Sequence, residues 1–245
     1  AAEMIIVSYN YTDGGNQSGV GDDPNYYGVI RVLDGTTCAQ HETIDDPANR
    51  VIAASPPAIA DLDGDGAAEI VTHRAVTGLV AFAWDGAKFA TKWVALDTGV
   101  TNTTRWDGPS IHDLDNDGLP EIVSGSAVFD GETGVRLNPD QLLPGAGAGV
   151  IPVLGDVDND GNIDIIAGSV WRWNIGMSKW EMAYVGAPNN RHYGYADFGT
   201  PGAMPADFDA TKLDGKAEIV SVGANLVRLH TLSGQLLLTG AIGSG

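Results

Sequence analysis

Acidic side chains recur in short loops whose spacing suits a bound cation. The stretch DLDGDGAAEIV begins at Asp61, DLDNDGLPEIV at Asp113 and DVDNDGNIDII at Asp156. Each stretch places carboxylates at positions 1, 3, 5 and 9 and a glycine at position 6. Because the chain curls between these positions, the carboxylates converge and repel one another unless a cation lies among them.

The types of ligand favour calcium. Ca²⁺ takes about six to eight oxygen ligands in flexible geometry, whereas zinc prefers the His and Cys ligands that these loops lack. Position 7 would add a backbone carbonyl, and the glycine allows the sharp turn. The predicted ligands are Asp61, Asp63, Asp65, Ala67 and Glu69; Asp113, Asp115, Asp117, Leu119 and Glu121; and Asp156, Asp158, Asp160, Asn162 and Asp164.

A fourth, irregular copy is predicted in DFDATKLDGKAEIV, which begins at Asp207. It keeps the ligand types but contains an insertion. Its predicted ligands are Asp207, Asp209, Asp214, the carbonyl of Lys216, and Glu218. The four copies start about 40 to 50 residues apart, which is the period of a propeller blade.

Each loop leads into a strand-like run such as EIV or DII, and a later run ends in a turn with glycine. An EF-hand would need a carboxylate at position 12 and flanking helices. We therefore expect an all-β protein, a single β-propeller domain of four-stranded antiparallel blades. The expected blades span about 1–54, 55–106, 107–149, 150–200 and 201–245.

The opening AAEMIIV matches AAEIV at the end of the first acidic loop. This match indicates that the first blade lacks its innermost strand and that the chain is part of a longer propeller. A complete ring of five blades is the alternative.

The composition excludes several classes of partner. A formal charge of −19 leaves no basic stripe for nucleic acid or for anionic lipid. No apolar run is long enough for a membrane span. The H-E-x-x-H, G-x-S-x-G and P-loop motifs are absent, so we expect no enzyme.

Tyrosines gather in two segments, 9–27 and 184–198. Loops on a rigid scaffold often carry recognition, and we expect these segments to bind a protein or a glycan. The six tryptophans lie in or beside predicted strands, where packing between blades is the first interpretation and sugar stacking the second.

The acidic loops resemble those of the FG-GAP family of β-propellers, which includes related bacterial repeats of the VCBS type and the integrin α-subunit head. The stretch FGTPGAMPADFD, residues 198–209, shares the Phe-Gly and Gly-Ala-x-Pro elements. The resemblance implies that calcium braces the blades without taking part in chemistry. It also implies a ring of seven blades and a secreted, periplasmic or cell-surface location.

Two classes of function follow. The first is a calcium-binding, non-catalytic module for adhesion or assembly outside the cell. The second is an accessory or catalytic propeller, lectin-like or lyase-type, of a secreted enzyme that acts on polysaccharide. A third interpretation is oligomer formation through the unpaired edge of the first blade.

Overall fold

The computed structural model describes residues 3–9, 27–53, 55–75, 77–96, 108–125, 127–139, 153–167, 169–184, 192–201, 208–209, 213–223 and 225–242. Their regular elements are strands, apart from one short 3₁₀ helix at Ile175–Met177. The prediction of an all-β protein is confirmed. Within these residues no helix has the length and apolar character needed to cross a bilayer.

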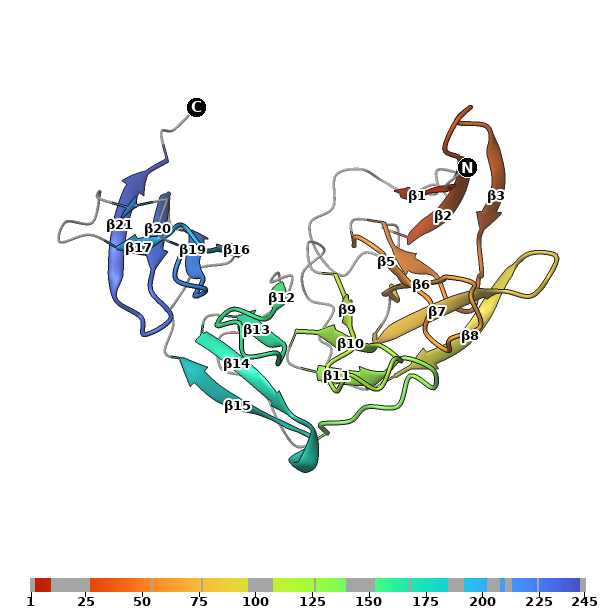
Figure 1. Ribbon diagram of the computed structural model, residues 1–245. Helices are drawn as coiled ribbons and strands as arrows, with labels where there is room; N and C mark the ends of the chain where they lie inside the picture. Colours follow the sequence, from red (N-terminus) through yellow and green to blue (C-terminus); the bar gives the residue numbers. More distant parts are fainter. Residues whose placement is uncertain are drawn as a thin grey trace.

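Five antiparallel sheets follow one another along the described chain (Figure 1). The first sheet contains β1 (Glu3–Tyr9), β2 (Tyr27–Asp34), β3 (Gln40–Ile44) and β4 (Val51–Ile52). The second contains β5 (Ala58–Ala60), β6 (Glu69–His73), β7 (Leu79–Trp84) and β8 (Phe89–Ala95). The third contains β9 (Ser110–His112), β10 (Glu121–Ser124) and β11 (Ala127–Asp130).

The fourth sheet contains β12 (Val153–Gly155), β13 (Asp164–Ala167), β14 (Ser169–Asn174) and β15 (Lys179–Tyr184). The fifth contains β16 (His192–Ala196), β19 (Glu218–Gly223), β20 (Leu226–His230) and β21 (Leu236–Ala241). A small sheet of β17 (Thr200–Pro201) and β18 (Phe208–Asp209) lies between β16 and β19 in the chain. Because β16 pairs with β19, the fifth sheet begins before residue 201, where the sequence analysis places its start.

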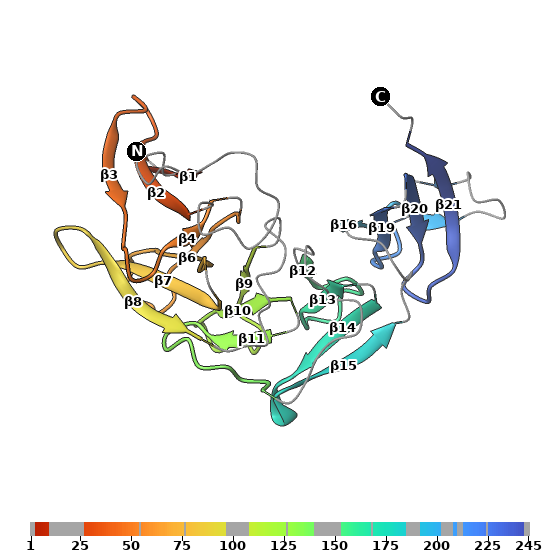
Figure 2. The ribbon, with the colours of Figure 1, turned by 180° about the vertical axis from the view of Figure 1, so that it is seen from behind.

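The sheets form an open arc, seen from opposite sides in Figures 1 and 2. The first and fifth sheets lie at the two ends of this arc, and the third and fourth lie between them. Four of the five sheets have the four strands expected for a repeat, and the described part of the third has three.

The order of strands explains how the first sheet differs from the others. In the second sheet the strand that follows the acidic loop, β6, lies between β5 and β7. In the first sheet β1 holds the sequence that matches β6, and its described neighbour is β2 alone. Within the described residues, β1 is therefore an edge strand, as expected from the match between AAEMIIV and AAEIV.

Apolar clusters join each sheet to the next. Three of these clusters contain the residue at position 2 of an acidic loop: Leu62, Leu114 and Val157. Leu62 packs with Ile122 and Phe129 of the third sheet. Leu114 packs with Ile165 and Val157 with Ile219, each in the following sheet. Since an aliphatic side chain gains about 1.5–3 kcal/mol on burial, each loop anchors the next sheet.

Polar contacts also join the second and third sheets. The ring of His73 lies 3.1 Å from Ser55 Oγ through Nδ1 and 2.8 Å from Ser124 Oγ through Nε2. The three side chains belong to residues that are at most 3% exposed. The indole N–H of Trp93 also donates to the carbonyl of Gly131 at 2.9 Å. These contacts hold the sheets in a set alignment.

Candidate metal centres

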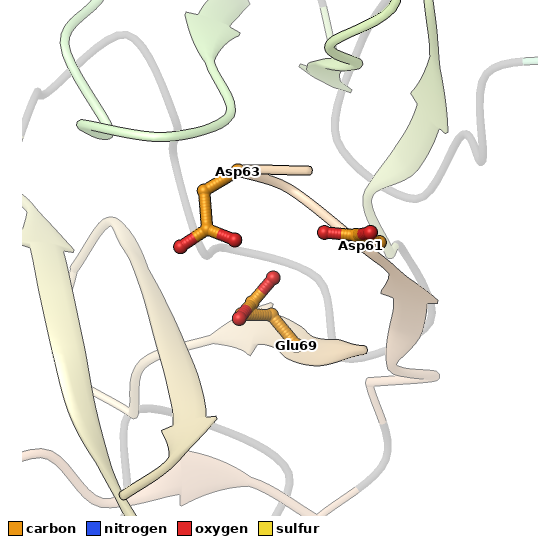
Figure 3. A group of neighbouring side chains, drawn as sticks. All are labelled: Asp61, Asp63 and Glu69. Atoms are coloured by element: carbon orange, nitrogen blue, oxygen red, sulfur yellow. The ribbon is translucent and has the colours of Figure 1, made fainter. Parts of the chain in front are cut away.

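The three regular loops bring their carboxylates together. In each loop, one oxygen from positions 1, 3 and 9 lies within 4.8 Å of the others. The three groups are Asp61, Asp63 and Glu69; Asp113, Asp115 and Glu121; and Asp156, Asp158 and Asp164. Figure 3 shows the first group, with its carboxylates turned toward one shared space.

Backbone hydrogen bonds shape each loop in the same way. The carboxylate at position 1 accepts the backbone N–H of the glycine at position 6: Asp61 from Gly66 at 2.9 Å, Asp113 from Gly118 at 2.9 Å and Asp156 from Gly161 at 2.8 Å. These glycines have φ values of 89°, 95° and 87°. Glycine adopts this left-handed conformation without the penalty that a Cβ atom imposes.

The acidic residue at position 9 is buried and bonded to position 2. The backbone N–H of Leu62 donates to Glu69 Oε2 at 2.8 Å, and that of Leu114 donates to Glu121 Oε2 at 2.7 Å. Glu69 is 2% exposed and Asp164 is fully buried. The carboxylate cluster is therefore tied directly to the leucine that anchors the next sheet.

Crowding and burial disturb the titration of these groups. Burial, reinforced by the charges of Asp115 and Asp113, raises the pKa of Glu121 to about 7. Burial also raises the pKa of Glu69, and it raises that of Asp164 to about 6 despite a neighbouring guanidinium. The cluster around Glu121 thus carries unfavourable negative charge at neutral pH, which a divalent cation would neutralise.

Two of the three clusters already contain a basic side chain. The ammonium group of Lys92 pairs with Asp63 and lies 3.7 Å from Glu69 Oε1. Arg172 contacts three carboxylates of the third loop: Asp158 at 3.3 Å, Asp160 at 2.7 Å and Asp164 at 3.1 Å. No basic group within the described residues pairs with the carboxylates of the second loop. The loop motif does not indicate Lys92 or Arg172, because both residues lie on other strands of the sheet.

The fourth loop begins at a residue that the sequence analysis did not select. Asp197 Oδ2 accepts the backbone N–H of Gly215 at 3.0 Å, as position 1 accepts from position 6 elsewhere. Glu218 Oε2 accepts the N–H of Phe198 at 3.0 Å, as position 9 accepts from position 2. Asp197 therefore holds the first position, and the small sheet β17–β18 is an insertion within the loop. The motif Asp-Phe-Gly at 197–199 and the end of β16 were the available signals.

Other predicted ligands divide as follows. Asp207 lies outside the described residues, and only the backbone of Asp209 is described, in β18. The side chains at position 5, Asp65, Asp117 and Asp160, are exposed and lie outside the groups of three. That the backbone carbonyls of Ala67, Leu119, Asn162 and Lys216 act as metal ligands stays a prediction.

The aromatic residues fall mainly within the sheets. Tyr193 packs in the cluster between the fourth and fifth sheets, and Tyr195 lies against Gly155. The expected recognition loop at 184–198 is therefore partly the strand β16, and residues 10–26 and 185–191 lie outside the description. Trp173 and Trp180 are buried edge to face, with ring centroids 5.2 Å apart, in the apolar cluster that joins the third and fourth sheets.

The ligand atoms that the three clusters offer are carboxylate oxygens, which hard cations prefer. The clusters and their hydrogen bonds recur loop by loop at one end of the strands β6, β10 and β13. A cation bound in each would hold positions 1, 3 and 9 together and would stiffen the connection between successive sheets.

Neither a scan against protein-family models nor a search of curated proteins finds a match. Among solved structures, the chain is similar to the V. cholerae biofilm matrix protein Bap1, with a TM-score of 0.60 and 19% identity over 98% of this chain and 39% of that one. It is also similar to the rhamnogalacturonan lyase YesW, with a TM-score of 0.57 and 18% identity over 98% and 44%. It is similar as well to the exotype rhamnogalacturonan lyase YesX, with a TM-score of 0.57 and 14% identity over 96% of this chain and 43% of that one.

At these identities the likeness concerns the fold. The chain spans about two fifths of the length of these structural neighbours.

Proposed function

We propose that this chain is a calcium-braced β-propeller segment of the FG-GAP type, which serves as a non-catalytic module for adhesion or assembly outside the cell. The observation that carries this proposal is the repeated link between a carboxylate cluster and an inter-sheet anchor. Calcium in the cluster would hold position 9, position 9 holds the N–H of position 2, and the side chain of position 2 packs on the next sheet.

The arc of five successive antiparallel sheets supports a propeller, because an apolar cluster joins each sheet to the next (Figure 1). Likeness to a biofilm matrix protein supports a location outside the cell. There, millimolar calcium saturates even weak sites.

A non-catalytic role is supported by the polar groups outside the acidic loops. The Ser55–His73–Ser124 cluster has the residue types of a nucleophilic site, but its members are buried between sheets. A polysaccharide would not reach them. We assign this cluster to holding the second and third sheets together.

Thermal unfolding of metal-free protein, with and without Ca²⁺, tests the proposal. We expect added Ca²⁺ to raise the melting temperature and a chelator to reverse the effect. Glu121→Gln should reduce the response. Glu181→Gln removes an exposed carboxylate from β15 and should leave the response intact. A melting temperature that is the same with Ca²⁺ and with chelator would refute the role of calcium.

The second candidate is a module of a polysaccharide-active enzyme, which the likeness to the two rhamnogalacturonan lyases YesW and YesX favours. The test is incubation of the chain with rhamnogalacturonan, followed by UV absorbance of unsaturated sugar products and by calorimetric binding. Product formation would establish the lyase alternative. Binding without product would support a lectin-like module. If neither product nor binding is observed, the result would favour the adhesion role with another partner.

A further inference from the structure

The three regular loops differ in the positive charge that surrounds them. All three carry carboxylates at positions 1, 3, 5 and 9, and in each the residue at position 9 is at most 7% exposed. A buried carboxylate needs a compensating charge or hydrogen bonds. The first and third loops obtain a positive charge from a side chain of their own sheet. The second loop has no such partner within the described residues.

Arg172 is placed in the third loop by strand pairing. It lies directly opposite Asp164 in the β13–β14 register, so its side chain shares a face with the carboxylate at position 9. Its guanidinium contacts positions 3, 5 and 9 of the loop, which are three of the four acidic ligands expected for the ion. A cation entering this loop must displace the guanidinium from these carboxylates.

Lys92 reaches the first loop through an irregularity in β8. Ala81 pairs with Trp93 and Phe82 pairs with Thr91, so Lys92 is the extra residue of a β-bulge. A bulge redirects a side chain out of the regular alternation of the strand. The ammonium group bridges positions 3 and 9, Asp63 and Glu69, and only 16% of the side chain is exposed.

The second loop differs from the other two at the positions that correspond to Arg172 and Lys92. The residue opposite Glu121 in the β10–β11 register is Asp130, which adds a negative charge where the fourth sheet has Arg172. In the described part of the chain the third sheet ends at β11, and no described strand beyond it offers a counterpart of Lys92. Among the described residues, the negative charge of this loop is thus left for a divalent cation to neutralise.

We propose that Lys92 and Arg172 are internal counter-ions that set the calcium affinity of the loops, leaving the second loop as the tighter site and the first and third as weaker ones. This inference rests on the proposed function, since it ranks the same sites. Removing either basic group takes a unit positive charge from contact distance of the ion and frees its carboxylates. The Coulomb repulsion between this group and a divalent cation at such a range is large enough that its removal should tighten binding by about tenfold or more.

Calorimetric titration of metal-free protein with Ca²⁺ tests the proposal, using wild type, Arg172→Gln and Lys92→Gln. We expect Arg172→Gln and Lys92→Gln each to bind one more Ca²⁺ ion per chain with high affinity than wild type does. Arg172→Lys keeps the charge and should stay like wild type, which covers the case that a neutral variant folds poorly. Lys179→Gln and Lys88→Gln remove a charge from the same sheets outside the loops and should titrate like wild type.

The outcomes distinguish failure of the counter-ion role from failure of the proposed function. Unchanged titrations of Arg172→Gln and Lys92→Gln, with calcium still bound, would overturn the counter-ion role and leave the proposed function standing. Tightening by Lys179→Gln or Lys88→Gln to the same degree would also overturn it, because general charge would then explain the effect. No calcium binding by any of the proteins would refute both. Loss of the tight event in Glu121→Gln would support the assignment of that event to the second loop.

Discussion

Replacing Glu121 with glutamine should have opposite effects on stability with and without calcium. In the metal-free protein, burial beside Asp115 and Asp113 raises the pKa of Glu121 from 4.5 to about 7. The folded state therefore binds more protons than the unfolded state between these pH values. The sign follows from linkage: stability from this group is fully present below pH 4.5 and is lost as pH rises toward about 7.

The magnitude follows from the same two values. The difference between 4.5 and about 7 corresponds to about 3 kcal/mol of unfolding free energy, and Glu121 is buried enough for solvent to screen little of it. Glutamine has the same shape, can accept the N–H of Leu114 and carries no charge. At pH 8 without metal, Glu121→Gln should be more stable than wild type by up to about 3 kcal/mol. At pH 4.5 the two should be close.

The assay is urea unfolding of both proteins in metal-depleted buffers from pH 4.5 to 8, repeated with millimolar Ca²⁺. Calcium should reverse the order, because wild type gains binding free energy that the variant loses. Parallel pH curves for the two proteins without metal, or a wild type that is more stable at pH 8 without metal, would refute the electrostatic reasoning.

Three further predictions concern the packing that the loops organise. Gly131→Ala should cost more than about 2 kcal/mol of unfolding free energy, since a Cβ there collides with the carbonyl oxygen of Pro120, whereas Gly194→Ala meets no atom within 4 Å and should be nearly neutral. Leu114→Ala should lower the free energy of unfolding by about 2–5 kcal/mol in a urea titration, with or without calcium, because its side chain fills the contact between the third and fourth sheets. Asp197→Asn should lower metal-free stability by about 1–3 kcal/mol, because the carboxylate accepts two backbone N–H groups, from Gly199 and Gly215. A melting temperature of Asp197→Asn equal to that of wild type would contradict the assignment of Asp197 to the first position of the fourth loop.

The local design of the acidic loops was readable from the chain. Positions 1, 6 and 9 lie within nine residues of one another, and the glycine at position 6 adopts the conformation that its spacing predicted. The all-β class was equally accessible, since each loop leads into β-branched residues that form β6, β10 and β13. These features depend on contacts between near neighbours, for which residue order is sufficient.

The fourth loop shows where residue order is not sufficient. Asp207 and Asp209 repeat the local spacing, yet Asp197 accepts the N–H of Gly215 across 18 residues. An insertion that forms β17 and β18 separates the first position from the rest of the motif. Asp197 follows β16, which pairs with β19, and this pairing brings its carboxylate to the N–H of Gly215. The spacing of residues in the chain does not predict that pairing.

Residue order thus determined that carboxylates recur at blade-like intervals, in turns suited to an oxygen-binding cation. Only the tertiary structure decided which positive groups enter those turns. Lys92 and Asp63 lie 29 residues apart in the chain, and a β-bulge brings their side chains together. Electrostatic energy depends on distance in space, so the charge of each cluster was settled by strand register and sheet packing rather than by the motif.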